Sequence, residues 1–302
     1  MFQKSYHEVF SLDPVQGRPC SVLSIQSHVA YGHVGNSAAQ FVMQRGGCDV
    51  LPLHTTLLSS HLGYEDCRGI IRSPEDLREL SKGVTRLDAF QEQDVMLLGF
   101  LGKVEHGELA LDLRGKMRGG TSLIVDPVMG DQGSLYVEQA LVRFYKEALT
   151  GLVHVMTPNQ YELGWLTGCS VSSVSTASKA LEVLDQQHEG SHPLLIATGV
   201  EEGTDGEHLY VLAHLDAQQV AFRVPRQPRT FAGAGDLFCA LLTTQLMYAP
   251  SIKVALLQAL EKTSQVLAFT HKTGRRELAL IASQKTLDVE PAVMSLVEEV
   301  IL

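Results

Sequence analysis

Short apolar runs recur along this chain from about Cys20 onward, and segments with helical spacing lie between them. Several of the runs are continuous and rich in Val, Ile and Leu, as expected for strands that are buried on both faces. We predict strands at 21–27, 49–55, 94–100, 122–128, 154–158, 194–198, 208–215 and 219–224. The intervening segments predict helices at 36–47, 74–84, 139–149 and 173–188, and four helix-like segments from about 235 to 302.

The alternation of strand and helix determines the fold class that we expect. A strand that returns through a helix pairs in parallel with its predecessor, and the helices then cover both faces of the sheet. We therefore predict an α/β three-layer sandwich with a mostly parallel central sheet. Residues 1–19 lack periodicity and contain Pro14, Gly17 and Pro19, so we place them in an N-terminal extension that lies over the surface or is disordered. We expect residues 20–302 to form a single domain.

Composition narrows the classes of partner. The 302 residues include 34 acidic and 24 basic side chains, a formal charge of −10, which argues against nucleic acid or an anionic membrane as the main partner. The apolar runs are far shorter than the roughly 20 residues that span a bilayer. The N-terminus also lacks the apolar region of a signal peptide, so we expect a cytoplasmic protein. Five scattered cysteines without a C-x-x-C pair support neither a disulfide framework nor a zinc site.

The segment Gly233-Ala234-Gly235-Asp236 opens the apolar run LFCALLTTQLMYA, so it stands at a predicted helix start. Small residues let backbone N–H groups approach a phosphate, and the first helical turn favours negative charge. Asp236 in the same turn is a candidate general base for an attacking hydroxyl. On this motif alone, a glycine turn followed by an Asp that caps the helix is an equally good interpretation.

Polar residues end the predicted strands, at the edge where open α/β sheets bind their ligands. They are Ser27, Thr55, Asp126, Thr157 and Asn159. Each of them taken singly is explained as an ordinary strand-end or capping residue. Their joint placement with the glycine turn favours a site.

Four motifs carry a resemblance to a known family. They are SHVAYGHVGN at 27–36, D-P-V-M-G-D at 126–131, T-P-N-x-x-E at 157–162 and G-x-G-D at 233–236. The set resembles the pyridoxal kinases of the ribokinase superfamily over about residues 20–275. The last three motifs are similar to vitamin kinases in general, including hydroxymethylpyrimidine kinases, whereas the first is similar to the pyridoxal kinases in particular.

The resemblance implies a ribokinase-like sandwich and an ATP-dependent phosphorylation of pyridoxal, pyridoxine or pyridoxamine at the 5'-hydroxymethyl group. Asp236 would be the catalytic base, and Gly233, Ala234 and Gly235 would form the anion hole. Asp126 and Glu162 would hold Mg²⁺, directly or through water, together with the nucleotide phosphates. The further ATP contacts would be Thr157, Asn159 and Thr198. A monovalent cation such as K⁺ is another candidate cofactor, with Asp131 nearby.

On the acceptor side, the resemblance places Ser27 and Thr55 at the pyridine ring and Tyr136 on a loop that covers the site. Tyr31, His28 and His33 are weaker pocket candidates. The family usually forms a homodimer, so we expect one here. Asn159 is also a good helix N-cap, and Glu162 would then be a solvated helix residue.

Three departures from the family pattern concern the closure of the loop at 131–136 over the site and the contacts with the substrate. The loop at 131–136 is short, Phe100 stands where tyrosine is frequent, and Ala197 stands where a hydroxyl residue is common. Two alternatives to a pyridoxal kinase remain. One is a hydroxymethylpyrimidine kinase, which the SHVAYGHVGN segment disfavours. The other is a non-catalytic carrier of pyridoxal or its phosphate, which would have no need of Asp236.

Overall fold

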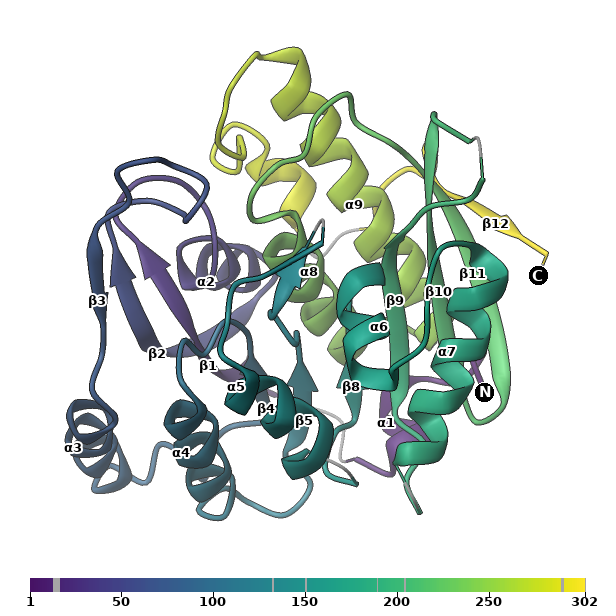
Figure 1. Ribbon diagram of the computed structural model, residues 1–302. Helices are drawn as coiled ribbons and strands as arrows, with labels where there is room; N and C mark the ends of the chain where they lie inside the picture. Colours follow the sequence, from purple (N-terminus) through teal and green to yellow (C-terminus); the bar gives the residue numbers. More distant parts are fainter. Residues whose placement is uncertain are drawn as a thin grey trace.

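One large sheet organises the computed structural model, which describes residues 1–12, 17–131, 133–149, 151–188, 190–203, 205–288 and 291–301 (Figure 1). Ten strands of the described ranges form this sheet. In spatial order they are β12 (Glu298–Val300), β11 (Gln218–Pro225), β10 (His208–Leu215), β9 (Leu194–Val200), β8 (Val155–Met156), β5 (Ser122–Val125), β4 (Val95–Leu98), β1 (Cys20–Val29), β2 (Cys48–Leu58) and β3 (Gly69–Ile71).

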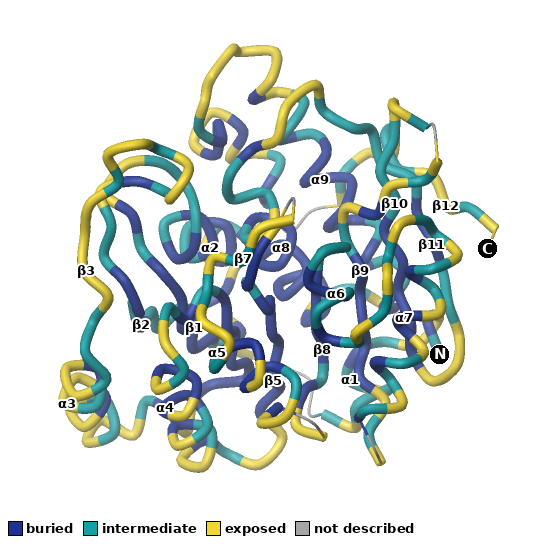
Figure 2. The backbone as a smooth tube through the Cα atoms, in the orientation of Figure 1, coloured by how far each residue is buried: buried dark blue, intermediate teal, exposed yellow. Residues whose placement is uncertain are grey.

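The centre of the sheet is parallel from β2 through β1, β4, β5 and β8 to β9. The edges are antiparallel, with β3 beside β2 and with β10, β11 and β12 beyond β9. All four residues of β4 and all four of β5 are buried (Figure 2). The continuous apolar runs of the sequence are therefore strands covered on both faces, as predicted.

Helices cover both faces of the sheet (Figure 1). On one face pack α2 (Asn36–Arg45), α8 (Ala234–Tyr248) and α9 (Ile252–Lys272). On the other pack α3 (Pro74–Thr85), α4 (Val104–Arg114), α5 (Gln139–Arg143) with its π-helical continuation (Phe144–Ala148), α6 (Gln160–Thr167) and α7 (Val174–Gln187). Successive side chains of β4 alternate between the two cores, Leu97 on the α8 side and Leu98 on the other. The three-layer α/β sandwich is confirmed.

The C-terminal third differs from the prediction of four helix-like segments. Its described residues form only α8, α9 and a short 3₁₀ helix (Gln284–Leu287), and the chain then runs as β12 along the edge of β11. The carboxylate of Glu261 in α9 accepts the backbone amides of Leu296 and Val297 at 3.0 and 3.1 Å. These bonds hold the tail extended, so tertiary contacts override its helical spacing.

The N-terminal segment packs on the domain through residues 1–12. It contains α1 (Tyr6–Phe10), and Phe2 and Tyr6 are buried in the same core as α8 and α9. The carbonyls of Phe2 and Lys4 accept the amides at the start of α9, at 2.9 and 2.8 Å. The segment is thus more firmly integrated than an extension over the surface, and the boundary at residue 19 stays a prediction. Pro14 lies outside the described residues.

A two-stranded hairpin, β6 (Gly130–Asp131) with β7 (Ser134–Leu135), follows β5 and stands apart from the main sheet. No helix within the described ranges combines the length and the apolar character needed to cross a bilayer.

A half-buried histidine, His154, directly precedes β8 and makes stability depend on pH. Burial, followed by the charge of Arg114, lowers the pKa of His154 to about 4, and its Nδ1 accepts the amide of Leu123 at 3.2 Å. Between about pH 6.5 and 4 the unfolded chain binds a proton on this ring more readily than the folded chain does. The free energy of unfolding is therefore highest above pH 6.5 and falls on acidification through this range. We expect His154→Asn to remove a pH-dependent part of the free energy of unfolding of about 3 kcal/mol between pH 7 and pH 4.

The measurement is urea unfolding of both proteins at several pH values in that window. His271→Asn, at an exposed position at the end of α9, is the matched control. Parallel stability curves for the native protein and His154→Asn would contradict the prediction.

Candidate active site

Gly233 begins α8 in a conformation that favours glycine. Its φ is +86°, and a side chain there would collide with the carbonyl of His33. The amide of Ala234 donates to Phe231 at 3.2 Å, whereas the first-turn amides of Gly235 and Asp236 have no partner among the described backbone bonds. The helix start therefore presents free N–H groups at the carboxyl ends of the parallel strands, where an anion can bind.

Asp236 lies in the first turn of α8 and contacts the loop that follows β1. Its carboxylate accepts the backbone N–H of Gly35, and burial raises its pKa although part of the residue stays accessible. A raised pKa makes a carboxylate a better proton acceptor near neutral pH. The glycine turn and the SHVAYGHVGN segment, about 200 residues apart in the sequence, thus form one site.

Asp126 follows β5 directly and lies beside the same helix start. Its Oδ1 accepts the hydroxyl of Thr157 at 3.1 Å. Burial, and then the charge of Asp236, raise the pKa of Asp126 to about 7. Two carboxylates that repel each other in a buried site favour the binding of a cation or of donor groups between them.

Glu162 is buried, with 3% of its surface exposed, so its interpretation as a solvated helix residue was wrong. The expected N-cap is confirmed: Asn159 caps α6, and Glu162 completes the capping box by accepting the Asn159 amide at 2.9 Å. Its other oxygen accepts the amide of Met129 at 2.9 Å. Burial and Asp126 raise its pKa well above the usual range, while these amides oppose the shift. Glu162 thereby fixes the chain between β5 and the β6–β7 hairpin.

The predicted nucleotide contacts cluster beside Glu162. Thr198, two residues before the end of β9, forms a parallel bridge with Asn159, and its amide donates to the carbonyl of Pro158 at 2.9 Å. The side chain of Asn159 donates to the carbonyl of Gly130 at 2.9 Å. Thr157 is buried against Asp126. The fold therefore brings all of these residues to neighbouring strand ends, while their contact with a nucleotide stays a prediction.

The carboxylates fit a magnesium ion that is shared with phosphates and water. Within the described residues there is no group of three or more His, Cys, Asp or Glu side chains that could hold a metal by itself. Both oxygens of Glu162 already accept amides, whereas Asp126 has one oxygen in contact with Thr157. Asp126 would thus suit direct contact with the ion and Glu162 a role through water, and both assignments stay predictions.

The predicted acceptor-side residues differ in accessibility. Ser27 is 6% exposed and lies against Gly35, where any side chain would collide with it. Thr55 is fully buried, and its hydroxyl donates to the carbonyl of Phe100 at 2.7 Å. Thr55 therefore joins β2 to the loop after β4, and its contact with a substrate stays a prediction. Tyr136 is half exposed beyond the β6–β7 hairpin, with its amide donating to Met129 at 2.8 Å.

His28 of β1 and His54 of β2 lie together, with ring centroids 4.5 Å apart and ring planes tilted by 38°. His54 Nδ1 lies 3.2 Å from the side-chain amide of Asn36, which donates to it, and His28 Nδ1 lies 3.1 Å from the hydroxyl of Ser37. Burial lowers the pKa of both rings, that of His54 to about 4. Both are thus neutral, hydrogen-bonded histidines at neutral pH.

Comparison with known proteins identifies the family. A family model described as phosphomethylpyrimidine kinase matches residues 87–279. The chain is 34% identical over 282 residues to pyridoxal kinase PdxY of Rubrobacter xylanophilus, which covers 91% of this chain and 96% of that relative. It is 32% identical over 285 residues to the pyridoxal kinase of Arabidopsis thaliana, with 88% and 90% covered. The chain belongs to the pyridoxal kinase family.

Solved structures agree with this assignment. The structure titled as pyridoxal kinase of Leishmania donovani in complex with ADP and pyridoxamine matches this chain with a TM-score of 0.81 at 27% identity, covering 93% of this chain and 99% of that one. The Entamoeba histolytica enzyme, at 23% identity, shares the fold with a TM-score of 0.83. The ribokinase-like resemblance is therefore confirmed.

Sequence motifs did not indicate some of the groups that complete the site. The amide of Gly35 and the carbonyl of His33 contact Asp236 and Gly233, although both residues lie in a motif that had been recognised. Backbone atoms of a loop carry no signal of their own in the sequence. Glu277, which lies after α9, was also missed, because a single glutamate beyond a helix resembles any exposed charge.

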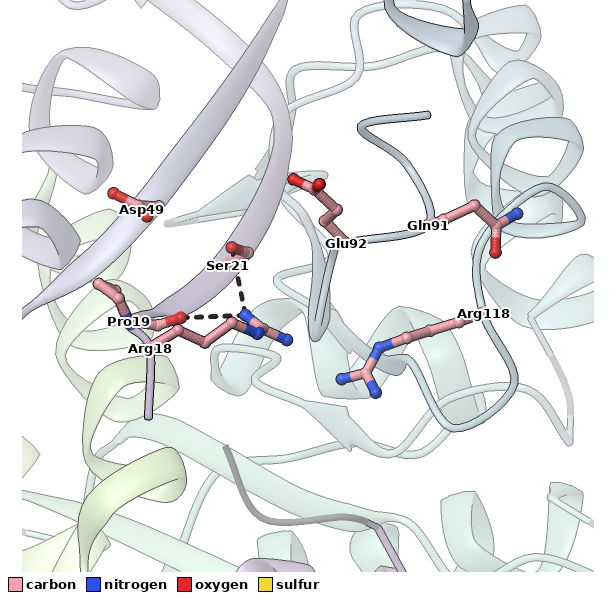
Figure 3. Close-up of a pocket in the computed structure, with 7 residues that line it drawn as sticks. All are labelled: Arg18, Pro19, Ser21, Asp49, Gln91, Glu92 and Arg118. Carbon is pink, nitrogen blue, oxygen red and sulfur yellow. Dashed lines mark hydrogen bonds between the residues drawn. The ribbon is translucent and has the colours of Figure 1, made fainter. Parts of the chain in front are cut away.

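A cavity of about 410 Å³ lies away from this site, at the amino ends of β1, β2, β4 and β5 (Figure 3). Its lining includes Arg18 and Arg118, and both arginines pair with the buried carboxylate of Asp94. Asp49 and Glu92 add negative charge to the wall. The arginines are thus already neutralised, and ligands of open parallel sheets bind at the opposite ends of the strands.

Proposed function

We propose that this chain transfers the γ-phosphoryl group of ATP to the 5'-hydroxymethyl group of pyridoxal, and of pyridoxine and pyridoxamine. The observation that carries the proposal is the junction of Asp236, the free amides at the start of α8 and the Gly35 amide. The candidate base, the proposed anion hole and the loop of the SHVAYGHVGN segment meet there. The 27% identical Leishmania donovani kinase, whose structure holds ADP and pyridoxamine, supports the same pair of ligands.

The geometry supports a single displacement. Asp236 accepts the proton of the acceptor hydroxyl. The oxygen of that hydroxyl bonds to the γ-phosphorus, and the bond from the γ-phosphorus to the bridging oxygen breaks and releases ADP. The amides of Gly235 and Asp236 would donate to the oxygens of the transferring group, whereas the amide of Ala234, also predicted to be part of the anion hole, already donates to Phe231. Asp126 and Glu162 would hold Mg²⁺, which neutralises charge on the phosphates when bound. Thr157, Asn159 and Thr198 would contact the nucleotide.

A hydroxymethylpyrimidine kinase is the second candidate, because the family model that matches residues 87–279 carries the name phosphomethylpyrimidine kinase. An assay of ADP release with Mg²⁺ and ATP separates the two when pyridoxal, pyridoxine, pyridoxamine and hydroxymethylpyrimidine are offered in parallel. We expect turnover of pyridoxal, with its phosphate confirmed by absorbance. Turnover of hydroxymethylpyrimidine alone would favour the second candidate, and pyridoxal binding without any turnover would favour a carrier.

Removal of divalent cations tests the proposed metal role. Since the described residues offer no all-protein cage, we expect EDTA to abolish turnover while the circular dichroism spectrum and melting temperature stay unchanged. Added Mg²⁺ should restore the activity. Unfolding on chelation would instead indicate a structural metal.

The remaining features of the proposal are a cytoplasmic location, activation by a monovalent cation such as K⁺ near Asp131, and a homodimer. Exposed Ile70 and Ile71 on the edge strand β3 support self-association, since apolar side chains on an unpaired edge favour a partner. Light scattering of the purified protein at several concentrations would measure its oligomeric state.

A further inference from the structure

Glu277 is a nearly buried carboxylate at the edge of the active site, with 10% of its side chain exposed. It lies in the segment that follows α9, and the next residue, Leu278, packs against Gly233 at the start of the catalytic helix. The described structure gives its Oε2 no hydrogen-bond partner. A buried oxygen without a partner is costly, so the carboxylate has a reason to be there beyond packing.

The contacts of Glu277 reach the loop that follows β2, at residues 59–68. Its Oε1 accepts the hydroxyl of Tyr64 at 2.7 Å and lies 3.3 Å from His61 Nε2. The amide of Gly63 donates to His61 Nδ1 at 3.1 Å, so the proton of the neutral ring is on Nε2, the nitrogen that lies near Glu277. One carboxylate oxygen therefore holds two side chains of this loop.

The same carboxylate lies directly against the loop that follows β1. A side chain at Gly32, whose φ is +97°, would collide with Glu277. Arg276 adds a second link to the loop after β2, because its guanidinium stacks 3.7 Å from the Tyr64 ring and donates to the Gly63 carbonyl at 3.2 Å. Both loops leave the carboxyl ends of strands, at the upper end of the sheet in Figure 1.

We propose that Glu277 is a positioning residue for the phosphoryl acceptor: it contacts Tyr64 and His61 and so holds the loop 59–68 against Gly32, three residues before the Gly35 that contacts Ser27 and Asp236. The proposal rests on the proposed function for the identity of the acceptor, pyridoxal. It assigns to Glu277 no contact with the reacting atoms. The loop after β1 also carries Gly35, the donor to Asp236, so loosening these contacts affects the acceptor side before the nucleotide side.

Two substitutions of Glu277, by Gln and by Ala, distinguish the loss of its charge from the loss of its contacts. In Glu277→Gln the remaining carbonyl oxygen still accepts from Tyr64 and stays close to His61, and the new amide replaces an oxygen that accepts no bond. Glu277→Ala loses both contacts. Since hydrogen bonds to a charged group contribute more than neutral ones, we expect Ala to raise the KM for pyridoxal by about ten- to a hundredfold and Gln by about threefold or less.

The KM for ATP should stay within about twofold in both variants, because the contacts of Glu277 lie on the acceptor side. Glu298→Ala is the matched control, since this exposed glutamate pairs with Arg223 on β11, near the opposite edge of the sheet from β2 and β3. Tyr64→Phe should raise the KM for pyridoxal in the same direction, and combined with Glu277→Ala it should be less than additive.

Hydrogen exchange of the apoprotein gives a readout that needs no activity. We expect faster exchange of residues 59–68 in Glu277→Ala than in the native protein, and little change in Glu277→Gln. If the native protein phosphorylates none of the vitamers, the proposed function fails, while the exchange result and pyridoxal binding still decide the positioning role.

Three outcomes would overturn the proposal. An unchanged KM for pyridoxal in Glu277→Ala would remove the link to the acceptor. Equal rises in both KM values with a lower melting temperature would indicate a purely structural residue. A Gln variant as impaired as the Ala variant would show that Oε2 itself binds the acceptor. If Glu277→Ala does not fold, Glu277→Gln and Tyr64→Phe carry the same comparison.

Discussion

Replacing Asp236 by asparagine is expected to lower kcat by about a hundred- to ten-thousandfold, the range usual for the loss of a general base. The amide keeps the size of the carboxylate and can still accept the N–H of Gly35, but it cannot accept a proton. The KM values and the melting temperature should therefore change little. Steady-state kinetics with pyridoxal and ATP, together with pyridoxal binding, would measure these effects.

Asp112→Asn, at an exposed position of α4, controls for the loss of one negative charge. Removing Asp236 also takes away the charge that, after burial, raises the pKa of Asp126, so the pKa of Asp126 should fall and the pH dependence of any residual activity should shift to lower pH. A kcat within about threefold of the native value would exclude Asp236 as the base, because general-base catalysis contributes at least a hundredfold.

The fold was largely predictable because local patterning and tertiary burial agree. The strand predicted at 208–215 has the observed bounds of β10, and Asn159 caps α6 as expected from its side chain. The glycine turn marked the start of α8, since an unhindered backbone there is visible as two glycines around an alanine. In each case a short stretch of sequence contains the physical cause.

Other features arise from residues far apart in the sequence. The tail near Leu296 has helical spacing, yet Glu261 and the free edge of β11 hold it extended. The bond between Gly35 and Asp236 and the contacts of Glu277 with Tyr64 connect segments separated by about 200 residues. Nothing in one segment indicates the other, so these parts of the site required the three-dimensional structure.

The other large effect is expected at Gly233, where alanine should lower kcat by about a hundredfold or more. A left-handed conformation costs an alanine about 1–2 kcal/mol, and its Cβ would in addition collide with the carbonyl of His33. The start of α8 must then move away from the loop after β1. The amides of Gly235 and Asp236 would move with it, and loss of one anion-hole donor alone costs about a hundred- to a thousandfold.

Gly120→Ala separates the effect of the left-handed backbone conformation from that of the collision with the His33 carbonyl. Gly120 has a φ of +87°, almost the same as Gly233, but a Cβ there would meet nothing within 4 Å. Both variants should lose about 1–2 kcal/mol from the free energy of unfolding through the backbone conformation. Only Gly233→Ala should lose turnover, since only it displaces the helix start. Equal activity in the two variants would mean that the first turn of α8 tolerates the displacement, and the anion hole would then have to lie elsewhere.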